Sequence, residues 1–300
     1  MTDKNATGPE SISWPESLET GRFTPYTKEI GVVAPGTKQR NDPTAESDGV
    51  DIRGPNDGPS VVFVHGAVFT RAMWAPQRDA LASDRKVIAL DLPGHGTRSD
   101  EDFEFDVALN LLESVVDKHA TDELLVVGLS LGGYLATEYV SHHPDRVDGV
   151  VLSGCSVNPV DGMELLTRAA GGITRLATRS ERVNRFVDNA AAKWVRKQDL
   201  TEEHKNEIID SGFYPKQFGN AGPDLAGRDF RAALATYPGL SLILNGERDV
   251  VMRRDEGSHA AAAQHCEIEI IENAGHVANL PRPAAYTDKI RDFMRQTVLA

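Results

Sequence analysis

A serine between glycines is the residue of this sequence best placed to do chemistry. In Gly128-Leu-Ser-Leu-Gly132, Ser130 follows a run of apolar, β-branched residues and precedes a segment with helical periodicity. A G-x-S-x-G turn in this strand–turn–helix setting exposes a nucleophilic hydroxyl. Backbone N–H groups at the start of the helix favour the negative charge that develops in acyl transfer. We therefore predict that Ser130 is a nucleophile; the alternative is a glycine-rich turn that only packs tightly.

Two further turns follow strand-like segments. His65-Gly66-Ala67 ends the strongest apolar run of the chain, and Asp91-Leu-Pro-Gly-His-Gly96 ends the next one. With the serine turn, these motifs make the chain from about residue 48 to its C-terminus similar to the α/β-hydrolase superfamily, in particular to small-molecule esterases and enol-lactone hydrolases. The resemblance implies that the backbone N–H groups of Ala67 and Leu131 form an oxyanion hole. It also implies that His65, Asp91 and His95 are structural.

A serine hydroxyl needs a base, and the base needs a third group to orient it. The family order is serine, acid, histidine, and it assigns Asp249 as the acid and His276 as the base. Glu247 and Asp161 are the competing acids. His276 lies in a loop, Asn-Ala-Gly-His-Val-Ala-Asn-Leu-Pro, that is similar to the family's catalytic-histidine loop. An imidazole with a pKa near ~6.5 can accept the serine proton at neutral pH.

The elements that must position these residues alternate in type. We expect strands at residues 27–33, 50–53, 60–65, 86–91, 123–129, 147–153, 240–245 and 266–271. We expect helices at residues 73–82, 105–119, 132–142, 163–178, 182–196, 201–211, 225–236, 252–264 and 283–297. Strands that alternate with helices predict an α/β fold with a mostly parallel, doubly wound sheet and helices on both of its faces.

Some 80 residues without a convincing strand interrupt this alternation. We predict a loose N-terminal segment at 1–22, a hydrolase core at 23–155 and 237–300, and a helical cap, or lid, at 156–236. Val68 and Phe69 beside the oxyanion loop, and Trp194 in the cap, are the candidate pocket residues. The other large apolar side chains of the cap are also candidate pocket liners, but we expect most of them to pack one cap helix against another; they are Leu165, Leu166, Ile173, Phe186, Phe213 and Phe218.

Composition excludes several classes of protein. The net charge of −13 argues against a nucleic-acid binder and against a polybasic membrane-surface protein. Two cysteines cannot form a disulfide framework, and their context indicates a reducing compartment or indifference to redox state. No nucleotide loop or metal-ligand spacing occurs, so we expect neither cofactor nor metal. With no signal-like N-terminus and no long apolar run, we expect a cytoplasmic protein.

These observations predict a serine hydrolase that cleaves a small-molecule carboxylic ester or lactone. Two enzyme alternatives, a C–C bond hydrolase and a cofactor-free perhydrolase, use the same triad. A third alternative is a ligand receptor on the same scaffold with slow turnover. Epoxide hydrolases and haloalkane dehalogenases resemble this fold but use an aspartate nucleophile, whereas Ser130 stands at that position here. The sequence leaves the substrate and the oligomeric state open.

Overall fold

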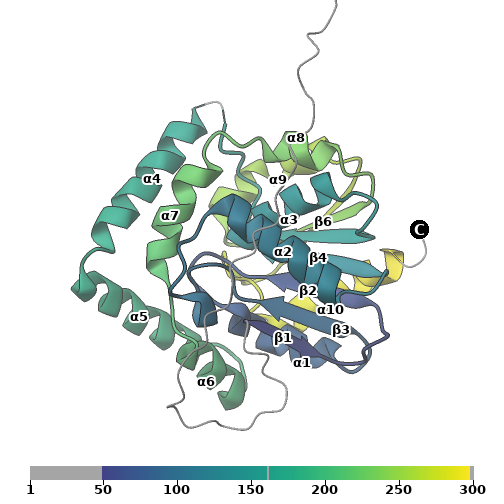
Figure 1. Ribbon diagram of the computed structural model, residues 1–300, viewed down its shortest axis with the longest axis horizontal. Coiled ribbons are helices and arrows are strands. Elements are labelled where there is room, and N and C mark those ends of the chain that lie inside the picture. Colours follow the sequence, from purple (N-terminus) through teal and green to yellow (C-terminus); the bar gives the residue numbers. More distant parts are fainter. Residues whose placement is uncertain (1–48, 161, 298–300) are drawn as a thin grey trace, which may run out of the picture. The chain divides into compact units, whose positions relative to one another are not determined.

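One seven-stranded sheet organises the chain. The computed structural model describes residues 49–160 and 162–297, and the strand predicted at 27–33 lies outside them, as does the N-terminal segment 1–22. The strand order is β1-β3-β2-β4-β5-β6-β7 (Figure 1), and every neighbouring pair is parallel except β1 with β3. The strands are β1 Val50–Arg53, β2 Ser60–Val64, β3 Lys86–Leu90, β4 Leu124–Leu129, β5 Gly149–Ser153, β6 Leu240–Gly246 and β7 His265–Ile271. The predicted α/β fold is confirmed.

The central strands are buried on both faces, which is why their sequences are continuously apolar. In β2, Val62 and Val64 belong to one apolar cluster, while Val61 and Phe63 belong to a second on the opposite face. The first cluster includes side chains of α2 (Phe105–His119) and α3 (Leu131–His142). The second includes side chains of α1 (Ala75–Leu81) and α10 (Pro283–Thr297). Apolar packing on both faces therefore fixes the sheet, and with it the carboxyl edge at which the strands end.

Most predicted helices occur close to their expected bounds. The segment expected at 73–82 is split into a 3-10 turn, η1 (Arg71–Trp74), and α1, which begins at Ala75 and carries Pro76 in its first turn, where proline is favoured. A second 3-10 turn, η2, spans Gly96–Arg98. The remaining helices are α4 Met163–Ala177, α5 Glu181–Arg196, α6 Glu202–Asp210, α7 Pro215–Leu225, α8 Phe230–Ala235 and α9 Val250–Ala262. No helix among the described residues combines the length and apolar character needed to cross a bilayer.

The helix α7 was not predicted, because its sequence carries two prolines and two glycines. Pro215 occupies the first turn, where backbone N–H groups have no partner within the helix, so a proline breaks no hydrogen bond there. Pro223 lies near the other end. Gly222 lies so close to α4 that a Cβ atom there would come within 2.9 Å of the Gly171 Cα. The glycines that weaken the helix signal in the sequence therefore allow α4 and α7 to approach closely.

Helices α4 to α8 lie between β5 and β6 in the sequence, within the segment predicted as the cap. We call α4 to α7 the helical insertion; α8 instead packs on α3, beside the sheet. Figure 1 shows α7 between α4 and the elements of the core, with α5 and α6 continuing below them. The expectation that most of the apolar side chains of this segment pack helix against helix is wrong, because five of them are exposed. Leu165, Leu166, Ile173 and Phe186 are 61–74% exposed, and Phe218 is 48% exposed.

Candidate active site

Ser130 lies at the sharp turn between β4 and α3. Its backbone has φ 55° and ψ −114°, a strained conformation for a residue with a side chain. The Ser130 N–H donates a hydrogen bond of 2.7 Å to the carbonyl of Ser153 at the end of β5, so the turn is fixed to the neighbouring strand. The structure thus places Ser130 at the carboxyl edge of the sheet, where open α/β folds bind their ligands.

The glycines of the serine turn are required by close backbone contacts. A Cβ atom on Gly132 would lie 2.1 Å from the Val64 carbonyl oxygen, and one on Gly128 would lie 2.2 Å from the Gly132 carbonyl oxygen. A Cβ atom on Gly133 would meet the Cys155 sulfur at 2.4 Å. The Cys155 thiol is buried, and burial raises its pKa, so it packs as a small apolar group.

Ser130, His276 and Asp249 form a continuous hydrogen-bonded chain. His276 Nε2 lies 3.0 Å from Ser130 Oγ, and His276 Nδ1 lies 2.7 Å from Asp249 Oδ2. Asp249 is 7% exposed, and its side chain also accepts a bond from the Met252 N–H, which caps α9. The Asp249 carboxylate accepts a hydrogen bond from the Nδ1–H group of His276, so the Nε2 lone pair is directed at the serine hydroxyl. The arrangement can remove the serine proton.

The loops that carry Asp249 and His276 are joined by backbone hydrogen bonds. The Arg248 N–H donates to the Ala274 carbonyl at 2.8 Å, and the Glu247 N–H donates to the Ile271 carbonyl at 2.9 Å. Glu247 itself accepts a bond of 2.8 Å from the Asn273 N–H, so the competing acid supports the histidine loop and has no contact with His276. The other competitor, Asp161, lies outside the described residues.

One predicted oxyanion donor, Leu131, directly follows Ser130, and the other, Ala67, follows β2, the strand paired with β4. The N–H groups of Ala67 and Leu131 donate to no other residue of ranges 49–160 and 162–297. Leu131 is the first residue of α3, and the Ala67 carbonyl is 2.9 Å from His95 Nε2. His95 is buried, and burial lowers its pKa. The buried imidazole therefore braces the residue that carries one of the two predicted donors.

His65 and Asp91 have the structural contacts expected of them. His65 Nε2 accepts a bond from the Leu92 N–H at 3.0 Å, which places the proton on Nδ1, 2.8 Å from the Gly66 carbonyl. Burial, reinforced by the neighbouring His95, holds the pKa of His65 well below its usual value, so the ring stays neutral. The buried Asp91 carboxylate accepts from the backbone N–H groups of Arg71 and Thr97.

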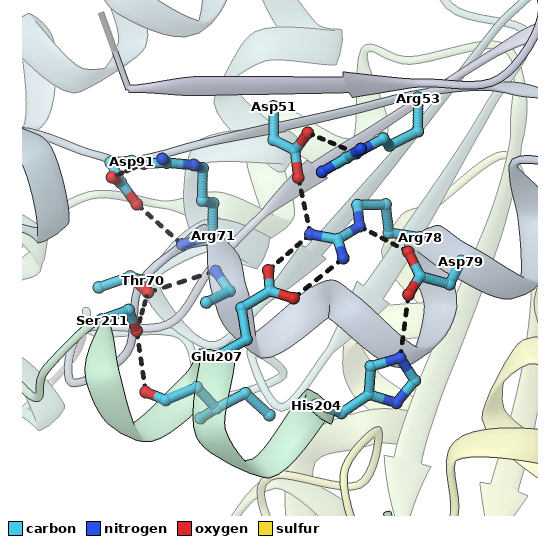
Figure 2. Close-up of polar contacts among 12 residues, drawn as sticks. Asp51, Arg53, Thr70, Arg71, Arg78, Asp79, Asp91, His204, Glu207 and Ser211 are labelled. Atoms are coloured by element: carbon cyan, nitrogen blue, oxygen red, sulfur yellow. Dashed lines mark hydrogen bonds and ion pairs between the residues drawn. The ribbon is translucent and has the colours of Figure 1, made fainter. Parts of the chain in front are cut away.

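A polar network joins the helical insertion to β1 and α1 of the core. Figure 2 shows Arg78 of α1 at its centre, with a two-pronged contact of 2.6 and 3.0 Å to Glu207 of α6 and a bond of 2.6 Å to Asp51. His204 of α6 contacts Asp79 at 3.0 Å. These contacts fix α6 to the outer strand and to α1.

The same helix is also bonded to the oxyanion loop. Thr70 donates to the Ser211 hydroxyl at 2.7 Å (Figure 2). Just beyond α6, the Tyr214 N–H donates to the Val68 carbonyl at 2.8 Å. The position of α6 is therefore coupled to the segment that carries Ala67.

The predicted pocket residues lie on both sides of this junction. The Phe69 ring contacts Phe213 at 5.6 Å and Trp194 at 6.4 Å between ring centroids, both edge to face. Phe69 is 9% exposed, whereas Trp194 at the end of α5 is 37% exposed. Val68 is partly buried and packs against the same apolar cluster. The structure thus brings Phe69 and Trp194 together, although 125 positions separate them in the sequence numbering.

Two buried amides that we did not single out also position the site. Asn245 Oδ1 accepts a bond of 2.9 Å from the N–H of Gly154, the residue whose Cβ position faces the His276 ring. Asn279 donates to the Met73 carbonyl at 3.0 Å, and Gln77 donates to the Asn279 carbonyl at 3.0 Å, which anchors the histidine loop to η1 and α1. Their only sequence signal is an amide at the end of a strand or in a loop, which is too common to identify them.

Comparison with known proteins agrees with the α/β fold. The family model described as "Alpha/beta hydrolase family" matches residues 61–289. The chain belongs to the alpha/beta hydrolase family. This hydrolase is 29% identical over 258 residues to a 3-oxoadipate enol-lactonase of Acinetobacter baylyi, covering 82% of the chain and 92% of that relative. It is 26% identical over 255 residues to a pimeloyl-[acyl-carrier protein] methyl ester esterase of Nitrosospira multiformis, covering 80% and 95%.

Solved structures show the same fold for this hydrolase. A thermophilic esterase from Thermogutta terrifontis is similar with a TM-score of 0.67 and 22% identity, over 83% of this chain and 93% of that one.

Two other relatives in sequence are longer proteins, of which the chain spans 65% and 44%. The family and its esterase and lactonase members make the protein a hydrolase.

Proposed function

We propose that this hydrolase cleaves a carboxylic ester or lactone of a small molecule through an acyl-enzyme on Ser130. The observation that carries the proposal is the hydrogen-bonded chain from Ser130 through His276 to Asp249, with separations of 3.0 and 2.7 Å. A base within hydrogen-bond reach of a nucleophile, and itself oriented by a third group, is the arrangement that acyl transfer requires.

In the first half of the reaction, His276 Nε2 takes the hydroxyl proton as Ser130 Oγ bonds to the carbonyl carbon of the substrate. The carbonyl oxygen becomes an oxyanion, which the N–H groups of Ala67 and Leu131 stabilise. When the tetrahedral intermediate collapses, the bond to the alcohol oxygen breaks, and the alcohol takes the proton from His276. The product is an ester of Ser130 and a free alcohol, or the opened chain in the case of a lactone.

In the second half, water takes the place of the alcohol. His276 accepts a proton from water while the water oxygen bonds to the acyl carbon, and the same two N–H groups hold the second oxyanion. Collapse breaks the bond to Ser130 Oγ, which regains the proton from His276. The carboxylic acid leaves, and Asp249, 7% exposed and hydrogen-bonded to Nδ1, stabilises the imidazolium in both halves.

The helical insertion takes the role of a cap over the substrate in this proposal. The contact between Phe69 and Trp194 supports it, because it places an aromatic side chain of α5 against the residue two positions after Ala67. Apolar walls near the reacting carbonyl exclude water and hold the acyl or alcohol part of a substrate.

The test is turnover of a panel of esters, lactones, vinylogous diketones and peracid-forming mixtures by wild-type protein and by Ser130→Ala. The proposal expects ester or lactone hydrolysis to dominate and Ser130→Ala to abolish it. Retained ester hydrolysis in Ser130→Ala refutes the role of the serine. Preferred cleavage of a C–C bond, or peracid formation, refutes the reaction type. Turnover that remains very slow with every substrate favours a ligand receptor.

A further inference from the structure

The helices α4 and α5 turn an apolar surface outward. In α4, the side that faces α7 carries Thr167, Gly171 and Thr174, of which Gly171 is buried against Gly222. The larger apolar side chains lie elsewhere on the helix. Four of them, together with one from α5, are 61–74% exposed: Leu165, Leu166, Ile173, Leu176 and Phe186. An amphipathic helix usually buries its apolar stripe, so this exposed surface is unusual.

The same two helices are basic, although the chain as a whole is acidic. The whole sequence has a net charge of −13. Between Met163 and Lys197, however, eight arginines and lysines stand against three acidic residues, a local net charge of +5. Within ranges 49–160 and 162–297, only Arg168 of these eight forms an ion pair, with Glu164 of the same helix. The other seven basic groups form no ion pair within these ranges and can meet the charges of an external partner. The net charge of the whole chain, from which we expected no membrane contact, conceals this local excess.

We propose that the α4–α5 surface, defined as residues 163–197, binds to the surface of an anionic membrane. Helices with a large apolar face and basic residues on their polar face lie in the plane of a bilayer interface. Leucine, isoleucine and phenylalanine side chains enter the acyl region, while arginine and lysine meet anionic headgroups. An acidic protein with an apolar face is the competing partner, because exposed apolar patches mark protein interfaces as well as membrane contacts, and the experiment below distinguishes the two.

The position of this surface connects it to the candidate active site. In α5, apolar residues recur from Phe186 through Val187, Ala190 and Ala191 to Trp194, at the spacing of one helix face. Trp194 contacts Phe69 at the oxyanion loop. A membrane that covers Phe186 thus lies at one end of an apolar stripe whose other end, Trp194, contacts Phe69, two positions after Ala67. Binding to the membrane does not require the chemistry of Ser130, so the two proposals can fail separately.

The experiment is flotation of the full chain with vesicles of phosphatidylcholine alone and of phosphatidylcholine with phosphatidylglycerol. We expect binding to the mixed vesicles, weaker binding as salt is raised, and little binding to phosphatidylcholine alone. Arg182→Glu should weaken the vesicle affinity by about tenfold or more, because each basic residue near an anionic bilayer contributes about a factor of five and the reversal also adds repulsion. Ile173→Ser should also weaken it, because the apolar contact is lost.

Matched controls separate this surface from general effects. Arg254→Glu on α9 makes the same change of charge, and Val107→Ser, 45% exposed on α2, makes a similar change of polarity. Both should bind mixed vesicles like the wild type, and all four variants should keep the wild-type melting temperature and turnover of a short soluble ester. Ser130→Ala should lose turnover and keep vesicle binding.

Three results would overturn the proposal. The first is absence of binding to mixed vesicles. The second is equal loss of binding in the matched controls. The third is a self-associating chain, or one that retains poly-glutamate in preference to the vesicles, which would indicate a second copy or an acidic protein as the partner.

Discussion

Replacement of Asp249 by asparagine separates geometry from proton transfer. The asparagine side-chain oxygen can still accept the bond from the Met252 N–H, so the cap of α9 is retained. Its amide group then faces His276 Nδ1 as a donor, at a site where Asp249 is 7% exposed and water has little access. Nδ1 must accept, so the imidazole proton moves to Nε2, which can no longer take a proton from Ser130.

The expected loss is about 10⁴-fold in kcat, the cost of this tautomer in serine–histidine–aspartate enzymes. At about 1.36 kcal/mol for each factor of ten, this is about 5.4 kcal/mol of transition-state stabilisation. KM should change little, because Asp249 contacts the imidazole and does not contact the substrate. The measurement is kcat and KM of wild type and Asp249→Asn with a short p-nitrophenyl ester, accompanied by thermal unfolding.

The matched control is Glu247→Gln, which removes the competing carboxylate two positions away. Glu247 accepts a bond from the Asn273 N–H, and a glutamine oxygen can accept the same bond. Its kcat should stay within a few-fold of the wild type. The reasoning is refuted if Asp249→Asn keeps kcat within a factor of ten, or if Glu247→Gln shows the large loss.

Other predictions concern the packing and the polar network. Gly132→Ala places a Cβ atom 2.1 Å from a backbone oxygen, so it should destabilise the folded protein by about 1–3 kcal/mol or more. Gly257→Ala on α9 has open space at its Cβ position and should stabilise the folded protein by about 0.5–1 kcal/mol. Equal effects of the two variants on the melting temperature would contradict this reasoning. Glu207→Gln should cost about 1–2 kcal/mol, less than a fully buried pair because Glu207 is 34% exposed, and an unchanged urea midpoint would count against the network. Burial raises the pKa of Asp79, but hydrogen bonds from Arg78 and His204 outweigh burial and lower that pKa. The contribution of Asp79 to the free energy of unfolding is therefore complete above the unfolded-state pKa of about 3.9 and is lost as pH falls further. Asp79→Asn should accordingly flatten the acid limb of a curve of stability against pH.

The sequence predicted those elements whose local structure restricts which residue types can occupy it. Ser130 was predicted as the nucleophile because its turn needs glycines at particular positions, and those glycines are visible in the sequence. The central strands were found because burial on both faces demands continuous apolar residues. The helix α2 was predicted with its observed bounds, Phe105–His119, because its apolar spacing is regular.

What the sequence could not show depends on contacts between distant segments. Gly219 and Gly222 indicate a broken helix until α4 is known to lie against them. Asn245 and Asn279 are ordinary amides until the loops they hold are in place. The exposed side chains of α4 were expected to be covered, because apolar periodicity shows which side of a helix is apolar and does not show what that side meets.

The central claim is that Ser130 carries the acyl group. The most direct measurement is rapid acid quenching of the hydrolase during turnover of an ester that deacylates slowly, followed by peptide mass spectrometry. The account predicts one acyl group for each active chain, on the peptide that contains Ser130, formed as fast as the burst of alcohol release and absent from Ser130→Ala. Turnover without an acylated peptide, or an acyl group on another residue with the same kinetics, would contradict it.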